Sequence, residues 1–219
     1  MKNLLSKQEL IDFEDNIAKS FNEKQIRAPI HLEYGNEEQL LKIFKNVQED
    51  DWICATWRSH YKCLLKGVPK EVLKKEILSG KSISLCYKEQ KIISSGIVGG
   101  TIPIALGIAL DIKRLKKKNH VWCLLGDMGS TTGGFHECYN YAHNFNLPVS
   151  YIIEDNGKSV CTDTRKVWTK DALFYEPYDS EWSDFDYRNG RIERLPNLIY
   201  YKYENEKYPH SGAGERIIF

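Results

Sequence analysis

Two short apolar segments, each ending in acidic or amide residues, constrain the fold of this chain more than any other feature. VWCLLGD covers residues 121–127, PVSYIIEDN covers residues 148–156, and the segment between them has helical character. Continuous apolar runs of this length are typical of strands buried on both faces, and such strands usually pair in parallel. A strand–helix–strand unit of this kind is right-handed, and it brings the carboxyl ends of its strands to one edge of the sheet. We therefore expect Asp127 and Asn156, which lie 29 positions apart, to meet at that edge.

The rest of the chain alternates between helical and strand-like patterns in the same way. The expected helices lie at residues 8–24, after Gly35-Asn36, from Pro69 to Leu78, and after a glycine-rich loop that begins at residue 95. The expected further strands end near Thr56 and cover 198–203 and 216–219, whereas 172–196 is predicted to be loop. These patterns predict an α/β fold with an open, mostly parallel sheet flanked by helices, and ligands at the carboxyl ends of the strands. Residues 1–219 are expected to form a single domain.

Composition excludes several classes of function. The 219 residues carry a formal net charge of +1, so no global field would recruit nucleic acid or an anionic membrane. The sequence contains no apolar run long enough to span a bilayer, and its first residues do not resemble a secretory signal. The six cysteines show no C-x-x-C pairing and are predicted to be reduced packing residues in a cytoplasmic protein.

The residues at the two strand ends suit a metal-bound diphosphate. One carboxylate, from Asp127, and one neutral carboxamide oxygen, from Asn156, match what Mg²⁺ takes from a protein when phosphate oxygens fill its remaining positions. Gly129, Gly133 and Gly134 let backbone N–H groups approach a diphosphate, and the start of the next helix adds a favourable dipole. A Gly-Asp pair is also common in turns, so the pattern alone leaves a structural turn and a magnesium–diphosphate anchor equally open.

The stretch that begins at Gly126 resembles the thiamine-diphosphate motif, Gly-Asp-Gly followed downstream by Asn-Asn. In particular, it is similar to the alpha subunits of 2-oxo acid dehydrogenases of the pyruvate, branched-chain and acetoin types. GGFHE at 133–137 matches this family closely. The resemblance implies that Asp127, Asn156 and the main-chain oxygen of Lys158 bind Mg²⁺.

The sequence departs from the motif at two positions. Met128 replaces the second glycine, which keeps the backbone N–H but adds bulk beside the phosphates. Asp155 replaces the first asparagine, and it is expected either to act as an alternative ligand or to leave the site slightly more acidic.

Three further segments resemble the same family, and they follow in the same order. IHLEYGNEE (30–38) is similar to His-Leu-x-x-Gly-Gln-Glu, WRSHYKCLLKGVP (57–69) to Tyr-Arg-x-His-Gly, and SGIVGGTIPIALGIA (95–109) to the Gly-Ile-Val-Gly loop. In the second segment, an arginine suits a bidentate grip on phosphate oxygens. The resemblance implies these contacts to the cofactor: Trp57, Arg58, Gly96, Ile97, Val98, Gly126, Asp127, Met128, Gly129, Asn156 and Lys158.

Three histidines are candidates for the chemistry. The resemblance places His31 and His60 in the cleft above the thiazolium, where they would shuttle protons or bind a substrate carboxylate. His210 lies in a C-terminal segment that resembles the family's Tyr-x-x-His only loosely, and it is a candidate for a phosphate or substrate contact. A lone histidine is also compatible with a structural role.

The resemblance implies the alpha-type subunit of a two-component enzyme that binds thiamine diphosphate and Mg²⁺ and decarboxylates a 2-oxo acid or cleaves a ketone. The sequence shows no second α/β domain, so the pyrimidine-binding domain is expected on a beta-type partner, in an α2β2 heterotetramer. Two alternatives remain at this stage: a transketolase-like carbon–carbon transferase subunit that takes a ketose, and a degenerate, non-catalytic subunit.

Overall fold

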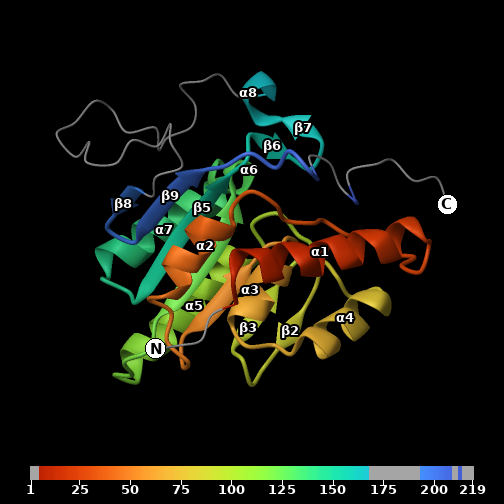
Figure 1. The fold of residues 1–219 in the computed structure, drawn as a ribbon. Coiled ribbons are helices and arrows are strands. Elements are labelled where there is room, and N and C mark those ends of the chain that lie inside the picture. The colour runs from red at the N-terminus through yellow and green to blue at the C-terminus, as the bar shows by residue number, and fades with distance from the viewer. Residues whose placement is uncertain (1–4, 168–192, 209–211, 214–219) are drawn as a thin grey trace.

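The chain folds into three layers, with one sheet between two sets of helices. A computed structural model describes residues 5–167, 193–208 and 212–213 (Figure 1). The strands of the sheet are β1 (Trp52–Ala55), β2 (Cys86–Tyr87), β3 (Ile92–Ser94), β4 (Val121–Gly126), β5 (Val149–Asp155), β8 (Glu193–Leu195) and β9 (Leu198–Lys202). The helices are α1 (Lys7–Asn22), α2 (Glu37–Phe44), α3 (His60–Leu65), α4 (Lys70–Leu78), α5 (Thr101–Arg114), α6 (Asp127–Ser130), α7 (Gly133–Asn144) and α8 (Thr164–Val167).

The sheet has the strand order β2-β3-β1-β4-β5-β9-β8. The five inner strands are parallel to one another, whereas the edge strands β2 and β8 pair antiparallel with β3 and β9. This arrangement confirms the expected α/β fold with an open, mostly parallel sheet. The chain runs outward from β1 to β3 and then returns across β1 to β4, so the direction of winding reverses between β1 and β4. Open α/β sheets bind ligands in the crevice at such a reversal.

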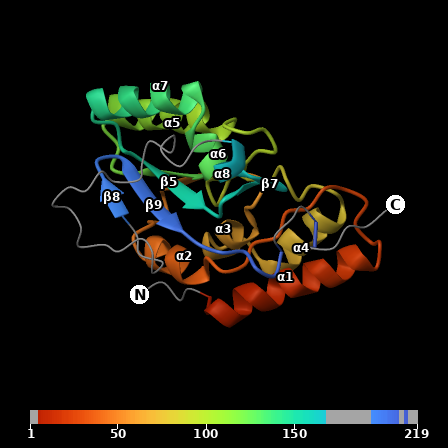
Figure 2. The same cartoon turned by 90° about the horizontal axis from the view of Figure 1, so that it is seen from above.

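Both faces of the sheet are buried, which explains the unbroken apolar runs of the central strands. Helices α1 to α4 cover one face, and α5 and α7 cover the other (Figure 2). Along β4, Cys123 and Leu125 pack toward α5 and α7, whereas Leu124 belongs to the core beneath α1 to α4. All six cysteines are free thiols. Cys54, Cys63, Cys123 and Cys138 are buried, as expected for packing residues, whereas Cys86 and Cys161 are exposed, so the packing role is wrong for these two.

Several elements agree with the sequence analysis, and others do not. The helices at α1, α2, α4 and α5 and the strands β1, β4, β5 and β9 are confirmed. The prediction of loop through residue 196 is wrong at Glu193–Leu195, which form the edge strand β8. A two-stranded hairpin, β6 (Lys158–Ser159) with β7 (Thr162–Asp163), was not expected. The strand predicted at 216–219 lies outside the described residues.

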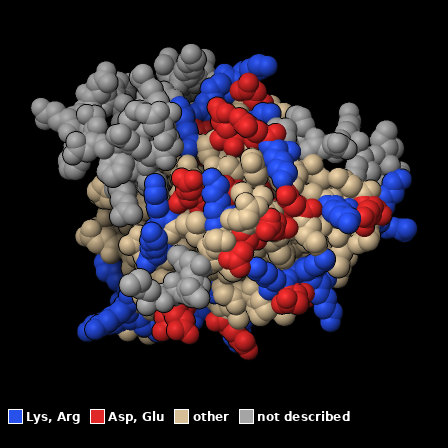
Figure 3. Space-filling view, viewed as in Figure 1, with Lys and Arg blue, Asp and Glu red and all other residues tan. Residues whose placement is uncertain are grey.

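Charged side chains are mixed over the surface. On the face seen in Figure 3, lysine and arginine side chains are interspersed with aspartate and glutamate. No helix in the described ranges has both the length and the apolar character needed to cross a bilayer.

The first prediction concerns Gly35, which follows the buried segment Ile30–Leu32. Its φ is +91°, and a Cβ there would lie 2.1 Å from the backbone oxygen of Glu204. Because neither the backbone conformation nor the neighbouring carbonyl can accommodate a methyl group, Gly35→Ala is expected to lower the free energy of unfolding by about 2 kcal/mol or more. Chemical denaturation at equilibrium measures the change.

Gly107 provides the matched control. It lies within helix α5, is exposed, and has no heavy atom within 4 Å of the position that a Cβ would occupy. Gly107→Ala is therefore expected to raise the free energy of unfolding by about 0.5–1 kcal/mol. Equal effects at the two glycines would contradict the close approach assigned to Gly35.

Candidate active site

The pocket lies at the carboxyl edge of the sheet, where the winding direction reverses. Three segments that follow strands contribute to its wall: Thr56–Arg58 after β1, Asp127–Gly129 after β4, and Asn156 after β5. Strands β4 and β5 pair in register with Gly126 opposite Glu154, so Asp127 and Asn156 both leave the sheet at this edge. The meeting of these two residues at one pocket agrees with the geometry expected from the sequence.

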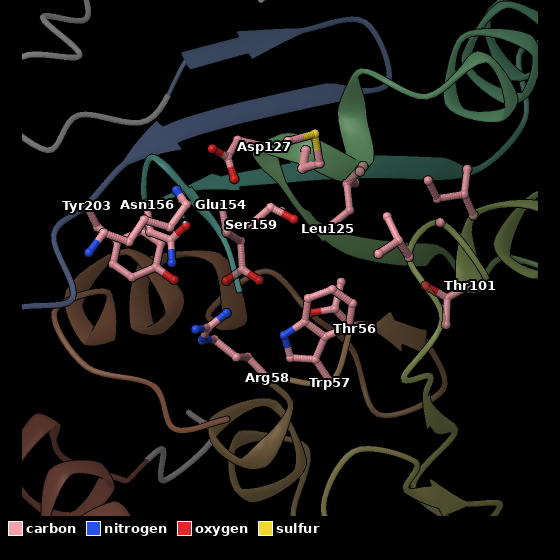
Figure 4. A pocket seen from close by; sticks show the side chains of 17 residues that line it. Thr56, Trp57, Arg58, Thr101, Leu125, Asp127, Glu154, Asn156, Ser159 and Tyr203 are labelled. Atoms are coloured by element: carbon pink, nitrogen blue, oxygen red, sulfur yellow. Dashed lines mark hydrogen bonds between the residues drawn. The ribbon is translucent and has the colours of Figure 1, made fainter. Parts of the chain in front are cut away.

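Figure 4 shows how the labelled side chains approach one another. Asp127 lies on one side of the pocket, and Arg58 and Trp57 enter from the opposite side. The carboxylate of Glu154 lies between them, and the side chains of Asn156 and Tyr203 lie to one side of it, at the left of the view. A basic group thus faces an acidic group across a small cleft.

Three side chains of the pocket keep a buried polar atom without a hydrogen-bond partner. These atoms are Oδ1 of Asp127, one terminal nitrogen of Arg58, and Nε1 of Trp57. Buried polar atoms are nearly always paired, so unpaired ones that share a pocket indicate that a ligand completes them. An open carboxylate oxygen suits a cation, and the open N–H groups suit the oxygens of an anion. The donor set therefore fits a metal together with a phosphate-like group.

Asp127 is held on its other side by groups of this chain. Its Oδ2 accepts hydrogen bonds from the Thr164 hydroxyl at 2.6 Å and from the Arg165 guanidinium at 3.2 Å. Burial and the neighbouring Asp155 carboxylate raise the pKa of Asp127 to about 7, although Thr164 and Arg165 oppose that shift. A cation at Oδ1 would favour the ionised form.

Arg58 is fixed so that one end of its guanidinium reaches the pocket. Its Nε donates to the Leu32 backbone oxygen at 3.3 Å, and the side chain is almost fully buried. The buried ammonium of Lys62 donates to the Arg58 backbone oxygen at 3.1 Å and lies 3.0 Å from Glu154. Lys62 also pairs with Glu33. The buried ammonium of Lys62 therefore helps to position two residues of the pocket wall, Arg58 and Glu154.

Nine of the predicted cofactor contacts line the pocket, and two do not. Those that line it are Trp57, Arg58, Val98, Gly126, Asp127, Met128, Gly129, Asn156 and Lys158. Gly96 and Ile97 are not among the lining residues; the side chain of Ile97 is 72% exposed. The predicted metal ligands Asp127, Asn156 and Lys158 share the pocket, and the Asn156 carboxamide oxygen accepts the Lys158 N–H at 3.1 Å.

Sequence reasoning missed several residues of the wall. These are Thr56, Gly99, Thr101, Ile102, Leu125, Glu154, Ser159 and Tyr203. Half of them, Thr56, Gly99, Leu125 and Ser159, are chain neighbours of a predicted contact, and that adjacency was the available signal. Tyr203 follows β9, and only the strand order shows that β9 lies beside β5.

The three candidate histidines differ in position. His31 lies next to the pocket, with its ring centroid 5.5 Å from that of Trp57 and an unpaired Nδ1. His60 is fully buried, and its ring nitrogens contact Glu14 at 3.0 Å and Ser82 at 2.9 Å. The structure therefore does not bring His60 to the pocket, and its contacts are those of a structural residue. His210 lies outside the described residues.

Asp155 does not line the pocket either. Its two oxygens contact the Arg165 guanidinium at 2.8 and 2.5 Å, and Oδ2 also accepts the Tyr200 hydroxyl at 2.5 Å. Burial alone would raise the pKa of Asp155, but Arg165 and Tyr200 outweigh it and hold the pKa below its usual value. The geometry supports neither a ligand role for Asp155 nor a more acidic pocket.

Comparison with known proteins identifies the family. The family model described as "Dehydrogenase E1 component" matches residues 6–175, which include the whole of the pocket except Tyr203. This chain belongs to the dehydrogenase E1 component family. The alpha-subunit resemblance expected from the motifs is thereby confirmed.

Curated relatives agree with the assignment to the E1 family. The chain is 32% identical over 165 residues to the alpha subunit of acetoin:2,6-dichlorophenolindophenol oxidoreductase of Bacillus subtilis, covering 70% of this chain and 49% of that protein. It is 29% identical over 178 residues to the pyruvate dehydrogenase E1 component subunit alpha of Rickettsia conorii, covering 74% and 55%. The corresponding subunit of Porphyra purpurea is 25% identical over 162 residues, covering 66% and 47%. The chain thus spans about half the length of these relatives.

The second prediction concerns the charge on His31. Burial, followed by the charges of Arg58 and His60, lowers the pKa of His31 to about 4. The unfolded chain takes up a proton near pH 6.5 and the folded chain only near pH 4, so protonation favours unfolding between these values. Stability should therefore fall by up to about 3 kcal/mol as the pH decreases from 6.5 to 4. The His31→Gln variant should lack this decrease in stability between pH 6.5 and 4. Denaturant titrations of both proteins at a series of pH values measure the difference.

Proposed function

We propose that this E1-family chain is the alpha-type, diphosphate-binding half of a two-component enzyme that uses thiamine diphosphate and Mg²⁺ to act on a 2-oxo acid or a related ketone. The observation that carries the proposal is the pair of open polar groups, Asp127 Oδ1 and the Arg58 terminal nitrogen, on opposite sides of one pocket at the sheet edge. The names of the relatives, alpha subunits of an acetoin:2,6-dichlorophenolindophenol oxidoreductase and of a pyruvate dehydrogenase E1 component, support this substrate class.

The residues of this chain would bind and orient the diphosphate end of the cofactor. Asp127 would hold Mg²⁺ through its open oxygen, together with Asn156 and the Lys158 backbone oxygen. Arg58 would bind phosphate oxygens through its open N–H, and the desolvated site strengthens that contact. A Cβ on Gly126 would meet no heavy atom within 4 Å, so the glycine leaves room for a ligand against the backbone.

The cofactor would supply the bond-breaking chemistry, and residues of this chain would shape the pocket around it. When bound, thiamine diphosphate supplies an electron sink for breaking a bond next to a carbonyl. The indole of Trp57 and the Leu125 side chain provide apolar parts of the wall that limit water in the pocket. His31 is neutral near pH 7 because of its low pKa, so it would accept or donate a hydrogen bond there and would not bind a carboxylate as a cation.

The other half of the active site would come from a beta-type subunit in an α2β2 heterotetramer. The support is a set of exposed apolar residues in the glycine-rich loop and the first turn of α5: Ile97 is 72% exposed, Val98 45% and Ile104 42%. Val98 lines the pocket and also borders a groove formed with Pro103 and Phe135. Large exposed apolar side chains that adjoin a ligand site are typical of subunit contacts.

The third prediction tests the metal anchor. Asp127→Asn removes the charge but keeps the shape, so it is expected to weaken Mg²⁺-dependent binding of thiamine diphosphate at least about a hundredfold. Isothermal titration calorimetry of the chain with its co-purified partner measures this affinity. Asp111→Asn, on the exposed side of α5, is the control and should bind like the wild type. If Asp127→Asn bound thiamine diphosphate as tightly as the wild type, Asp127 would not be the metal anchor of the cofactor.

The fourth prediction tests the partner surface. Ile97→Asp places a charge on the exposed apolar surface, and it is expected to dissociate a complex with the beta-type subunit without unfolding the chain. Leu115→Asp is a matched control, because Leu115 is 57% exposed at the other end of α5. Analytical ultracentrifugation of the co-expressed subunits distinguishes the two variants. A complex that survives Ile97→Asp, or full turnover by this chain alone, would contradict the proposed interface.

A further inference from the structure

Arg165 occupies an unusual place beside the anchor. It lies on α8 directly after the β6–β7 hairpin, two of whose residues line the pocket. Its guanidinium makes a bidentate contact with Asp155, at 2.8 and 2.5 Å, and reaches Asp127 Oδ2 at 3.2 Å. Its side chain is 23% exposed, whereas those of the two carboxylates are almost fully buried. One arginine therefore connects both acidic residues at the ends of β4 and β5.

With Asp127 ionised, as a bound cation would favour, this cluster carries one net negative charge. Asp127 and Asp155 each contribute a carboxylate, and Arg165 neutralises one of them through two short hydrogen bonds. The Tyr200 hydroxyl takes part in holding Asp155 away from the pocket. Because Oδ2 of Asp127 is already occupied, Oδ1 is the oxygen of this pair that remains for a ligand.

We propose that Arg165 is a positioning residue that sets the charge of the anchor, so that the site takes a divalent cation together with a diphosphate and not a cation alone. This inference rests on the function proposed above and adds the residue that decides its ligand preference. With one effective carboxylate, a bound Mg²⁺ keeps a net positive charge and still attracts an anion. With two unpaired carboxylates, the cation would be fully neutralised and a diphosphate would be repelled.

The inference predicts opposite effects on two ligands, which a loss of folding alone cannot produce. In Arg165→Gln, the affinity for Mn²⁺ in the absence of phosphate should rise about tenfold, because a second carboxylate becomes unpaired. In the same variant, the affinity for inorganic diphosphate at saturating Mg²⁺ should fall about tenfold. Arg165→Lys keeps the charge and should stay within about threefold of the wild type for both ligands.

A double variant provides the decisive rescue. In Asp155→Asn with Arg165→Gln, the extra carboxylate and its counter-charge are both removed, so both affinities should return to within about threefold of the wild type. Asp155→Asn alone leaves Arg165 uncompensated and should weaken Mn²⁺ binding about tenfold. Lys166→Gln changes the exposed neighbouring cation on α8 and serves as the control, with no change expected.

The measurements are titrations of the full chain with Mn²⁺ alone and with inorganic diphosphate in Mg²⁺, and circular dichroism reports whether each variant is folded. If Arg165→Gln is unfolded, Asp155→Asn alone and the double variant still test the charge. A rise of both affinities in Arg165→Gln, or wild-type Mn²⁺ affinity in Asp155→Asn, would overturn the inference. If the wild type binds no diphosphate in the presence of Mg²⁺, the proposed function itself is wrong. That result is distinct from a failure of the Arg165 inference, in which the wild type binds diphosphate but the variants do not show the expected changes.

Discussion

The parallel, in-register pairing of β4 with β5 is the constraint on which the rest of the site depends. Gly126 lies opposite Glu154, so the chains that leave these strands carry Asp127 and Asn156 into the same pocket. A shift of one residue in this pairing would turn every side chain of one strand to the other face of the sheet. The register is fixed by burial on both faces: Ile152 belongs to the core beneath α1 to α4, and Ile153 to the core beneath α5 and α7. Packing of the core and placement of the site therefore have the same cause.

A buried charge network beneath the pocket adds a second level of order. Lys62 is fully buried between Glu33 and Glu154, and Glu154 also accepts hydrogen bonds from Tyr201 at 2.6 Å and from Asn36 at 3.3 Å. Burial raises the pKa of Glu33 to about 8, against the opposing effect of Lys62. Networks of this kind contribute little net stability, because desolvation offsets the attraction between the charges. This network instead orients the pocket wall, because Lys62 contacts both the Arg58 backbone oxygen after β1 and the Glu154 carboxylate near the end of β5.

The sequence predicted the parts of the fold in which local pattern and tertiary environment agree. The apolar runs of β4 and β5 predict buried parallel strands, and the ends of those strands carry the residues that meet. The pairs that the sequence could not reveal are those between distant segments. His60 lies in a motif that resembles a catalytic one, but its position depends on Glu14 of α1 and Ser82, which no local pattern connects to it. The same reason explains why Tyr203 was missed as a wall residue, because only the strand order places β9 beside β5.

The fold accommodates the two departures from the cofactor motif in different ways. Met128 lines the pocket, and its sulfur lies 3.8 Å from the Thr131 hydroxyl, within the short turn that follows β4. Asp155 adds a carboxylate next to Asp127, the proposed metal ligand, and a buried unpaired charge there would be costly. Arg165 and Tyr200 occupy both of its oxygens, so the added charge is balanced outside the pocket. The compensating residue lies ten positions along the chain, beyond a hairpin, and a motif comparison limited to the strand end does not include it.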